Sequence, residues 1–201
     1  MGSAPDRDIP QLLVRLNRRG RLHAGKRSSA MLNRHIFLIG MPGSGKSTLG
    51  RRAARETGVP FVDLDEWIEA AAGLSIPEIF ERFGEAGFRK AETGAVIRMT
   101  RNAPALISLG GGTAMDPVNR KIIRGFGSVI LLDRPPEKIL EDLRPEERPL
   151  LRDNPEEKLW ALYEQRMPVY RQLADVTIRN DGDFQTAEML LVRVLKERYH
   201  A

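Results

Sequence analysis

The sequence contains no cysteine and no hydrophobic run close to the roughly 20 residues that a membrane-spanning helix needs. Without cysteine, the chain has no disulfide bond, no thiol nucleophile and no cysteine-ligated metal, which suits the reducing cytoplasm. Its 201 residues are 41% hydrophobic and 29% charged, which are ordinary proportions for a globular protein. The composition therefore predicts a cytoplasmic protein with one globular domain and no membrane partner.

Most of the chain also lacks an excess of charge of either sign. The formal net charge is +5, and residues 1–33 carry it, because they contain seven Lys or Arg residues and two Asp residues. The remaining residues contain equal numbers of basic and acidic side chains. A nucleic-acid-binding domain usually has a basic surface, so we expect no nucleic-acid partner. The chain is thus divided into a basic N-terminal extension, residues 1–33, and one domain, residues 34–201.

Three interpretations of the extension remain open. The first interpretation is a disordered basic segment. The second is that translation begins at Met31. The third is an organellar transit peptide, because the segment is rich in Arg and poor in acidic residues. A secretory signal is disfavoured because the segment has no continuous apolar core. We favour the first two interpretations, and the sequence does not separate them.

A glycine-rich segment follows the first strongly apolar run. The run His35–Ile39 predicts a buried strand, and FLIGMPGSGKST (Phe37–Thr48) then supplies Gly40, four residues, and Gly-Lys-Ser before a helical pattern. Glycines in this order let backbone N–H groups surround phosphate oxygens, while the helix N-terminus adds partial positive charge. Lys46 can reach the β- and γ-phosphates, and the hydroxyl of Ser47 can bind Mg²⁺. The segment predicts binding of a nucleoside triphosphate.

Short apolar runs alternate with helical patterns along the domain. This alternation favours an α/β fold, in which a mostly parallel sheet has helices on both faces. Ligands of such sheets bind beyond the carboxyl ends of the strands, where the glycine-rich segment already lies. The charged, proline-containing segment 144–155 predicts a mobile loop. Strands are predicted at His35–Ile39, Pro60–Val62, Ala105–Leu109, Ser128–Leu132 and Val176–Ile178, and helices at Lys46–Thr57, Glu66–Ala72, Ile76–Phe83, Glu85–Arg101, Pro136–Leu143, Pro155–Leu173 and Phe184–Tyr199.

Two acidic residues, Asp63 and Asp65, follow the second predicted strand. A spacing of two at a strand end points both carboxylates to the same side, toward the edge that holds the phosphate-binding segment. One acid can then hold Mg²⁺ through water while the other orients an acceptor hydroxyl. The structural alternative is that Asp65 caps the helix predicted at Glu66–Ala72. Both interpretations can hold for one residue.

Further candidates are arginines and a run of glycines. Arg89 has Glu85 and Glu92 at helical spacing, which is typical of a surface ion pair, but a guanidinium is also the natural bidentate partner of a carboxylate substrate. The glycines 110–112 follow a predicted strand, where they permit close backbone approach to a ligand or form a plain turn. Arg148 and Arg166 are each compatible with binding phosphate or substrate, or with a solvated charge.

Taken together, these motifs resemble those of the shikimate kinases. The shared segments run from Ile36 to the C-terminus, with matching intervals: GMPGSGKST, DLD, SIPEIFERFGEAGFRKAE, SLGGG, RPLL and R-x-P-x-Y. The phosphate loop alone is generic, whereas FRxxE, GGG and RPLL in this order are specific to the family. The resemblance implies an α/β, three-layer P-loop kinase fold: a five-stranded parallel sheet flanked by helices, with a substrate-binding region and a lid over about 144–155. It also implies a monomer.

The resemblance further implies a reaction, ATP plus shikimate giving ADP plus 3-phosphoshikimate, in aromatic amino-acid (chorismate) biosynthesis. Asp65 would bind the acceptor hydroxyl, either as a base or as an orienting group, and Gly111 would donate a backbone N–H to the substrate. Arg89 and Arg166 would grip the shikimate carboxylate. Mg²⁺ would be bound by Ser47 directly and by Asp63 through water. The ATP-binding residues would be Gly43, Ser44, Gly45, Lys46, Ser47, Thr48 and Arg148, of which Lys46 and Arg148 would act with Asp65 in catalysis.

Two alternatives stay open at this point. One is a neighbouring small-molecule kinase, acting on gluconate or a nucleoside monophosphate. Another is a non-catalytic nucleotide-binding module that uses the basic extension to capture a partner. Two departures from the family pattern concern the nucleotide: Arg144 stands alone before RPLL, and acidic Asp181 and Asp183 lie where some relatives have a basic adenine contact.

Overall fold

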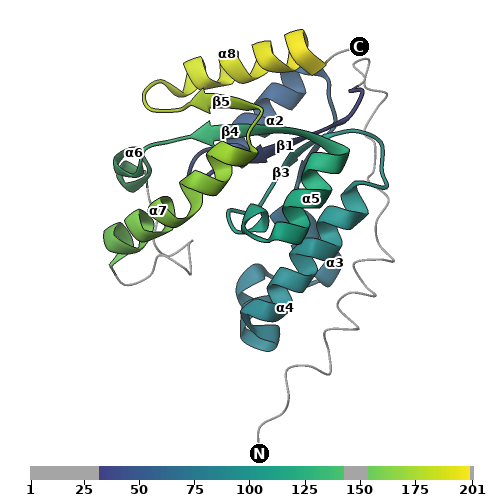
Figure 1. Ribbon diagram of the computed structural model, residues 1–201, viewed down its shortest axis with the longest axis vertical. Coiled ribbons are helices and arrows are strands. Elements are labelled where there is room, and N and C mark those ends of the chain that lie inside the picture. The colour runs from purple at the N-terminus through teal and green to yellow at the C-terminus, as the bar shows by residue number, and fades with distance from the viewer. Residues whose placement is uncertain (1–31, 143–153, 200–201) are drawn as a thin grey trace, which may run out of the picture.

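The computed structural model describes residues 32–142 and 154–199 (Figure 1). Arg148, Arg144 and nearly all of the predicted lid segment and N-terminal extension lie outside these residues. None of the helices in the described part combines the length and the apolar character that a membrane span needs.

The strands are β1 (His35–Ile39), β2 (Phe61–Asp63), β3 (Leu106–Ser108), β4 (Gly127–Asp133) and β5 (Val176–Arg179). The helices are α2 (Lys46–Thr57), α3 (Leu64–Ala72), α4 (Ile76–Met99), α5 (Pro117–Phe126), α6 (Pro136–Glu141), α7 (Pro155–Leu173) and α8 (Phe184–Val194), with short turns η2 (Thr113–Met115) and η5 (Leu195–Tyr199).

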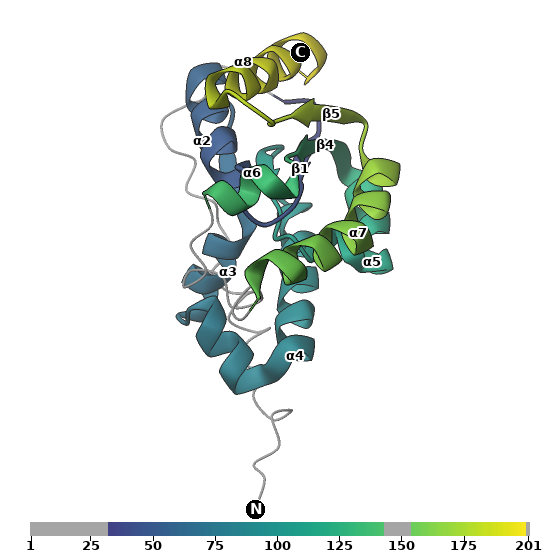
Figure 2. The ribbon, with the colours of Figure 1, turned by 90° about the vertical axis from the view of Figure 1, so that its left-hand side faces the viewer.

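The five strands form one parallel sheet in the order β2-β3-β1-β4-β5. Parallel neighbours need crossover connections, which the helices provide, and both faces of the sheet are therefore covered. Figures 1 and 2 show α2 and α8 on one face, and α3, α4, α5 and α7 on the other. The predicted three-layer α/β fold is confirmed.

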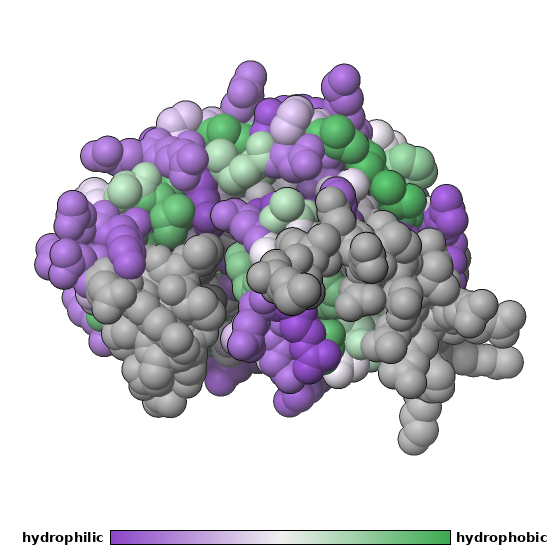
Figure 3. Space-filling model, turned by 90° about the horizontal axis from the view of Figure 1, so that it is seen from below, coloured by the Kyte–Doolittle hydropathy of each residue, from purple (hydrophilic) through white to green (hydrophobic). Residues whose placement is uncertain are grey.

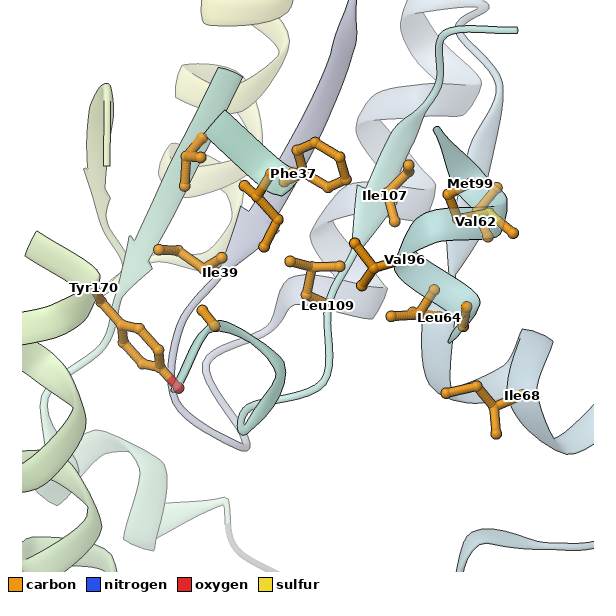
Figure 4. Packing of buried hydrophobic residues seen from close by; sticks show 14 of the residues in the cluster. Phe37, Ile39, Val62, Leu64, Ile68, Val96, Met99, Ile107, Leu109 and Tyr170 are labelled. Carbon is orange, nitrogen blue, oxygen red and sulfur yellow. The ribbon is translucent and has the colours of Figure 1, made fainter. Parts of the chain in front are cut away.

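Alternation along the central strand separates two hydrophobic clusters. Phe37 and Ile39 of β1 point into the larger cluster, against α3, α4 and α7, whereas Ile36 and Leu38 point toward α2 and α8. Figure 4 shows the larger cluster from close by, with Phe37, Ile39 and Tyr170 among its members. These four residues of β1 are each at most 2% exposed. Because both faces of the strand are buried, the run is continuously apolar instead of alternating between apolar and polar residues. In the view of Figure 3, by contrast, hydrophilic and hydrophobic residues are mixed over the described surface.

The structure corrects the predicted elements at two places and confirms a predicted break. Helix α5 is absent from the predicted set, although Asp116 caps its N-terminus through Val118 N–H and Pro117 occupies its first turn. The break predicted at Gly84 is confirmed, because Gly84 has non-helical geometry with φ of 68° and divides α4 into two helical parts. The helix predicted at Glu66–Ala72 begins earlier, at Leu64, and this shift moves an important acid.

Helix α2 packs closely on the sheet at Gly50. A Cβ added there would lie 2.6 Å from the Phe61 ring and 2.8 Å from a Leu38 methyl group, whereas one added at Gly125 in α5 would meet nothing within 4 Å. We expect Gly50→Ala to lower the free energy of unfolding by about 1–3 kcal/mol, the usual cost of overpacking. Gly125→Ala, the control, should be neutral or stabilise by about 0.4–1 kcal/mol.

Urea unfolding of both variants and the wild type checks this expectation, because a lower midpoint at constant slope reports stability alone. Equal midpoints for Gly50→Ala and the wild type would show that α2 does not depend on the small residue for its contact with β1 and β2.

Candidate active site

The chemistry-bearing residues gather where the parallel strands end. The phosphate loop follows β1, Asp63 closes β2, and Gly110 comes just after β3, while Arg134 and Asn180 directly follow β4 and β5. Because all strands run the same way, these five positions share one edge of the sheet. Strands β4 and β5 therefore contribute residues to the edge that the sequence motifs did not indicate.

Three glycines of the phosphate loop have backbone conformations that other residues rarely adopt. Gly40, Gly43 and Gly45 have φ values of 150°, 82° and 93°. At Gly40 a Cβ would also lie 2.5 Å from the carbonyl oxygen of Leu132. The loop thus bends tightly between β1 and α2, and helix α2 begins at Lys46 with its first N–H groups toward the loop.

Lys46 spans the inside of this loop. Its ammonium group donates to the carbonyl oxygens of Gly40 at 3.0 Å and Met41 at 2.9 Å, and the side chain is 8% exposed. These bonds hold the charge at the loop, where it neutralises phosphate. Ser47 and Thr48, by contrast, are exposed in the first turn of α2, where their hydroxyl groups are accessible to a ligand.

Two residues that the motif analysis did not select support the loop from outside. Asn180 donates its side-chain amide to the carbonyl oxygen of Ser44 at 3.0 Å, and Arg134 donates to that of Gly43 at 3.2 Å. Asn180 is 4% exposed, so this hydrogen bond is shielded from water. Their position just after a strand of a parallel sheet is the signal that would have identified them.

Asp63 and Asp65 differ from the predicted arrangement. The strand ends at Asp63, whose carboxylate accepts hydrogen bonds from the N–H groups of Asp65 at 3.1 Å and Glu66 at 3.3 Å. Asp63 is therefore the cap of helix α3, and Asp65 lies in its first turn. The prediction that two strand-borne carboxylates point to one side is wrong, as is the alternative that Asp65 is the cap.

The Asp65 carboxyl group carries a perturbed charge. Burial, followed by the nearby carboxylates of Asp63 and Glu92, raises its pKa to about 6, while Lys46 opposes the shift. One of its oxygens, Oδ1, is buried and has no hydrogen-bond partner in the described structure. A carboxylate that takes a proton from a hydroxyl group acts as a general base. A free acceptor oxygen and a raised pKa are the properties that such a base requires.

Three consecutive glycines, residues 110–112, form the surface against which the charged side chains pack; we call this surface the glycine floor. A Cβ at Gly110 would lie 2.8 Å from oxygens of both Asp65 and Glu92, and one at Gly111 would lie 3.0 Å from Nη1 of Arg166. At Gly112 the distance to Nη1 of Arg89 would be only 2.2 Å. The stretch therefore brings predicted residues from α3, α4 and α7 together, and any larger residue would displace them.

Arg89 is held by acids of its own helix. It donates to Glu92 at 2.5 Å and to Glu85 at 3.1 Å, so the surface-type ion pairs that the spacing indicates do form. Glu92, however, is only 1% exposed, and it also accepts a hydrogen bond from the hydroxyl of Thr113 at 2.6 Å. Glu92 thus fixes Arg89 against the glycine floor, a role that its exposed neighbour Glu85 does not have.

Arg166 is a buried cation with hydrogen-bonding capacity left over. It is 5% exposed, and its Nε and Nη1 atoms have no partner among the described residues. Tyr170, one turn along α7, donates its hydroxyl to the carbonyl oxygen of Gly111; Figure 4 shows this hydroxyl pointing toward the loop. Burial raises the pKa of Tyr170, so the hydroxyl stays protonated as a donor.

The described structure thus brings together most of the predicted site residues. Lys46 and the glycines of the phosphate loop form one end, and Asp65, Arg89, Gly111 and Arg166 converge at the other. Arg148 lies outside the described residues. No group of three or more His, Cys, Asp or Glu that could hold a metal occurs among the described residues, and a Mg²⁺ ion bound mainly by phosphates, water and one hydroxyl needs no such group.

Comparisons with known proteins identify the family of this chain. The sequence model of the shikimate kinase family matches residues 42–196. The chain is 44% identical to a shikimate kinase of Thiobacillus denitrificans over 146 residues, which cover 72% of this chain and 80% of that protein. It is 43% identical to a shikimate kinase of Neisseria meningitidis over 164 residues, covering 81% and 96% of the two chains.

A solved structure gives the same result in three dimensions. The shikimate kinase of Acinetobacter baumannii in complex with shikimate superimposes with a TM-score of 0.75 at 38% identity, covering 81% of this chain and 91% of that one. That of Bacteroides thetaiotaomicron gives a TM-score of 0.72 at 30% identity, covering 81% and 96%. The family model, the sequence relatives and the solved structures agree, and the chain belongs to the shikimate kinase family.

Proposed function

We propose that this chain transfers the γ-phosphate of ATP to the 3-hydroxyl group of shikimate, giving 3-phosphoshikimate and ADP. The observation that carries the proposal is the pair of unsatisfied groups at the glycine floor: the buried N–H donors of Arg166 and the unpartnered oxygen of Asp65. A ligand that has both a carboxylate and hydroxyl groups satisfies both, and shikimate is such a ligand.

The carboxylate end of the substrate lies between two guanidinium groups. Arg166 and Arg89 approach the same glycine stretch, with Nη1 atoms 3.0 Å and 2.2 Å from Cβ positions that glycine leaves empty. Two planar guanidinium groups in fixed positions bind a carboxylate better than they bind a neutral sugar or a purine. Burial of Arg166 makes the match selective, because a substrate without an anion leaves this charge unpaired.

The hydroxyl end of the substrate meets Asp65. Its carboxylate approaches Gly110, next to the glycines that the substrate arginines approach, and Lys46 is close enough to oppose its pKa shift. Asp65 is therefore near both the substrate arginines and the phosphate loop, where it orients the acceptor hydroxyl oxygen toward the transferred phosphoryl group and receives its proton. The N–H of Gly111 donates to the substrate beside it.

ATP is bound by the phosphate loop, through Gly43, Ser44, Gly45, Lys46, Ser47 and Thr48. The supporting hydrogen bonds from Asn180 and Arg134 keep the loop preorganised, so that little reorganisation is needed when charge develops on the γ-phosphate. Ser47 binds Mg²⁺ directly and Asp63 through water, and the ion supplies charge neutralisation when bound. In this proposal Arg148, which lies outside the described residues, adds positive charge at the γ-phosphate.

We further propose a monomeric cytoplasmic enzyme whose partners are ATP and shikimate, without nucleic acid or membrane. The absence of cysteine and the neutral charge of residues 34–201 support this. Residues 1–33 remain a separate basic extension in this proposal.

A coupled assay of ADP release with Mg-ATP tests the proposed reaction. We expect turnover with shikimate and little or none with gluconate or AMP. AMP has no carboxylate, and the open chain of gluconate does not hold its carboxylate and hydroxyl groups in one rigid arrangement. Quinate, a close analogue, measures how strictly the ring is recognised. Turnover with none of these acceptors would reject the proposed function.

The pKa of Asp65 predicts the acid limb of the pH profile. Because the ionised carboxylate is the active form and its pKa is about 6 in the free protein, kcat/KM should fall below that pH by about tenfold per unit. Asp65→Asn should lower kcat by at least about a hundredfold and abolish this limb. A near-normal kcat in Asp65→Asn would exclude Asp65 as an essential base.

The same raised pKa means that the ionised form of Asp65 lowers the stability of the folded protein. The folded-state pKa lies above the ordinary value of 3.8, so the ionised group disfavours folding above about pH 6, and the penalty disappears as both states become protonated. The Asp65→Asn variant should therefore have a higher melting temperature than the wild type at neutral pH, by roughly 2–4 °C per kcal/mol gained. In acid, where the penalty is absent, the two proteins should have the same melting temperature. A lower melting temperature at neutral pH would contradict the assigned environment.

The fork geometry of Arg89 predicts a binding defect. We expect Arg89→Lys to raise the KM for shikimate by about tenfold or more with a smaller change in kcat, because Lys keeps the charge but loses the bidentate contact. Arg82→Lys on the same helix is the matched control, since Arg82 is exposed and only loosely paired with Glu78 at 4.0 Å. An unchanged KM in Arg89→Lys would remove this residue from the substrate site.

A further inference from the structure

A hollow of about 270 Å³ is lined by residues of α5 and of the C-terminal end of α7, both of which are labelled in Figures 1 and 2. One part of its wall is basic, formed by Arg120, Lys121 and Arg124, and another part is apolar, formed by Pro117, Val169 and Leu173. None of these six residues belongs to the proposed ATP and shikimate sites. We propose that the hollow binds a small organic phosphate, and that its occupancy is transmitted through Arg120 to the glycine floor of the active site.

Two of the three basic side chains, those of Arg120 and Arg124, are held by hydrogen bonds that do not neutralise their charge. Arg120 donates from Nη1 to the carbonyl oxygens of Ala114 at 3.1 Å and Met115 at 2.7 Å, and Arg124 donates to that of Gln172 at 2.5 Å. These acceptors are neutral. Within residues 32–142 and 154–199, no carboxylate forms an ion pair with any of the three cations. Their positive charge therefore faces the hollow uncompensated.

This arrangement suits a phosphate monoester. Two guanidinium groups and one ammonium group complement a dianion, and guanidinium forks match phosphate oxygens in bidentate geometry. The apolar side chains offer a surface for the organic part of the ligand. A volume of about 270 Å³ is sufficient for a small molecule with one phosphate group.

The walls of the hollow are connected to the active site through two sets of bonds. Arg120 holds the carbonyl groups of η2, which directly follows the glycine floor 110–112. On the other wall, Val169 precedes Tyr170, whose hydroxyl bonds the Gly111 carbonyl. A phosphate that draws the Arg120 guanidinium into the hollow weakens the first connection, and the glycine floor loses support. The expected consequence, which rests on the proposed function, is a higher KM for shikimate.

The binding experiment uses phenyl phosphate as the probe and the full chain saturated with Mg-ADP and shikimate. Isothermal titration is compared for the wild type, for Lys121→Gln/Arg124→Gln, and for a control, Arg34→Gln/Arg55→Gln, which removes the same charge at two exposed positions of the domain. Glutamine at 124 retains a donor for the Gln172 carbonyl. Methyl NMR of Val169 and Leu173 locates the bound probe. Benzoate serves as a second titrant that carries a carboxylate in place of the phosphate.

We expect saturable binding of phenyl phosphate with shifts of the Val169 and Leu173 methyl signals. Affinity should fall at least about tenfold in the Lys121/Arg124 variant, since two charge-assisted contacts are lost, and stay within about twofold in the control. Equal affinity in all three proteins, or methyl signals that do not move, would overturn the site. Tighter binding of benzoate than of phenyl phosphate would overturn the assignment to phosphates.

The kinetic arm measures the KM for shikimate with and without phenyl phosphate. The probe should raise this KM in the wild type and in the control but not in Lys121→Gln/Arg124→Gln, whose basal kcat should be unchanged. A rise that persists in the Lys121/Arg124 variant would show competition at the active site and contradict the transmission. If shikimate is not a substrate, only this arm fails, because the titration does not depend on catalysis.

Discussion

The site depends on one steric constraint, the absence of side chains at residues 110–112. Carboxylate oxygens from α3 and α4 and guanidinium nitrogens from α4 and α7 come within 3.0 Å of the three positions where side chains would begin. A single methyl group would separate an acid or an arginine from the others. The sheet fixes the start of this stretch, because it follows β3 directly, and the surrounding helices can then converge on it.

Charge burial is the second constraint, and it opposes stability. Arg166 retains unpartnered N–H groups at 5% exposure, and burial raises the pKa of Asp65 to about 6. Both conditions cost folding free energy in the absence of a ligand. A substrate with the complementary anion and hydroxyl group recovers this energy on binding, so the unsatisfied groups give selectivity at the expense of the free protein's stability.

Local patterns predicted much of the fold, and their failures have physical causes. The phosphate loop, β1, α2 and α7 were predictable because glycine spacing, a continuous apolar run and helix-start signals act over a few residues. Helix α5 was missed because it is short and mostly polar, although Asp116-Pro117 marks its start. The cap of α3 was assigned to Asp65 instead of Asp63 because a shift of two residues at the strand–helix junction exchanges a capping position for a helical one.

The sequence by itself determined the α/β architecture, the nucleotide loop and, through its ordered motifs, the family and most of the candidate residues. These depend on local conformation or on resemblance, both of which are readable along the chain. Only the tertiary structure decided that Glu92 is buried behind Arg89 and that Asn180 and Arg134 support the phosphate loop. It also decided that three cations line one hollow without an ion pair to any carboxylate of the described residues. Those facts depend on contacts between segments far apart in sequence, which packing alone brings together.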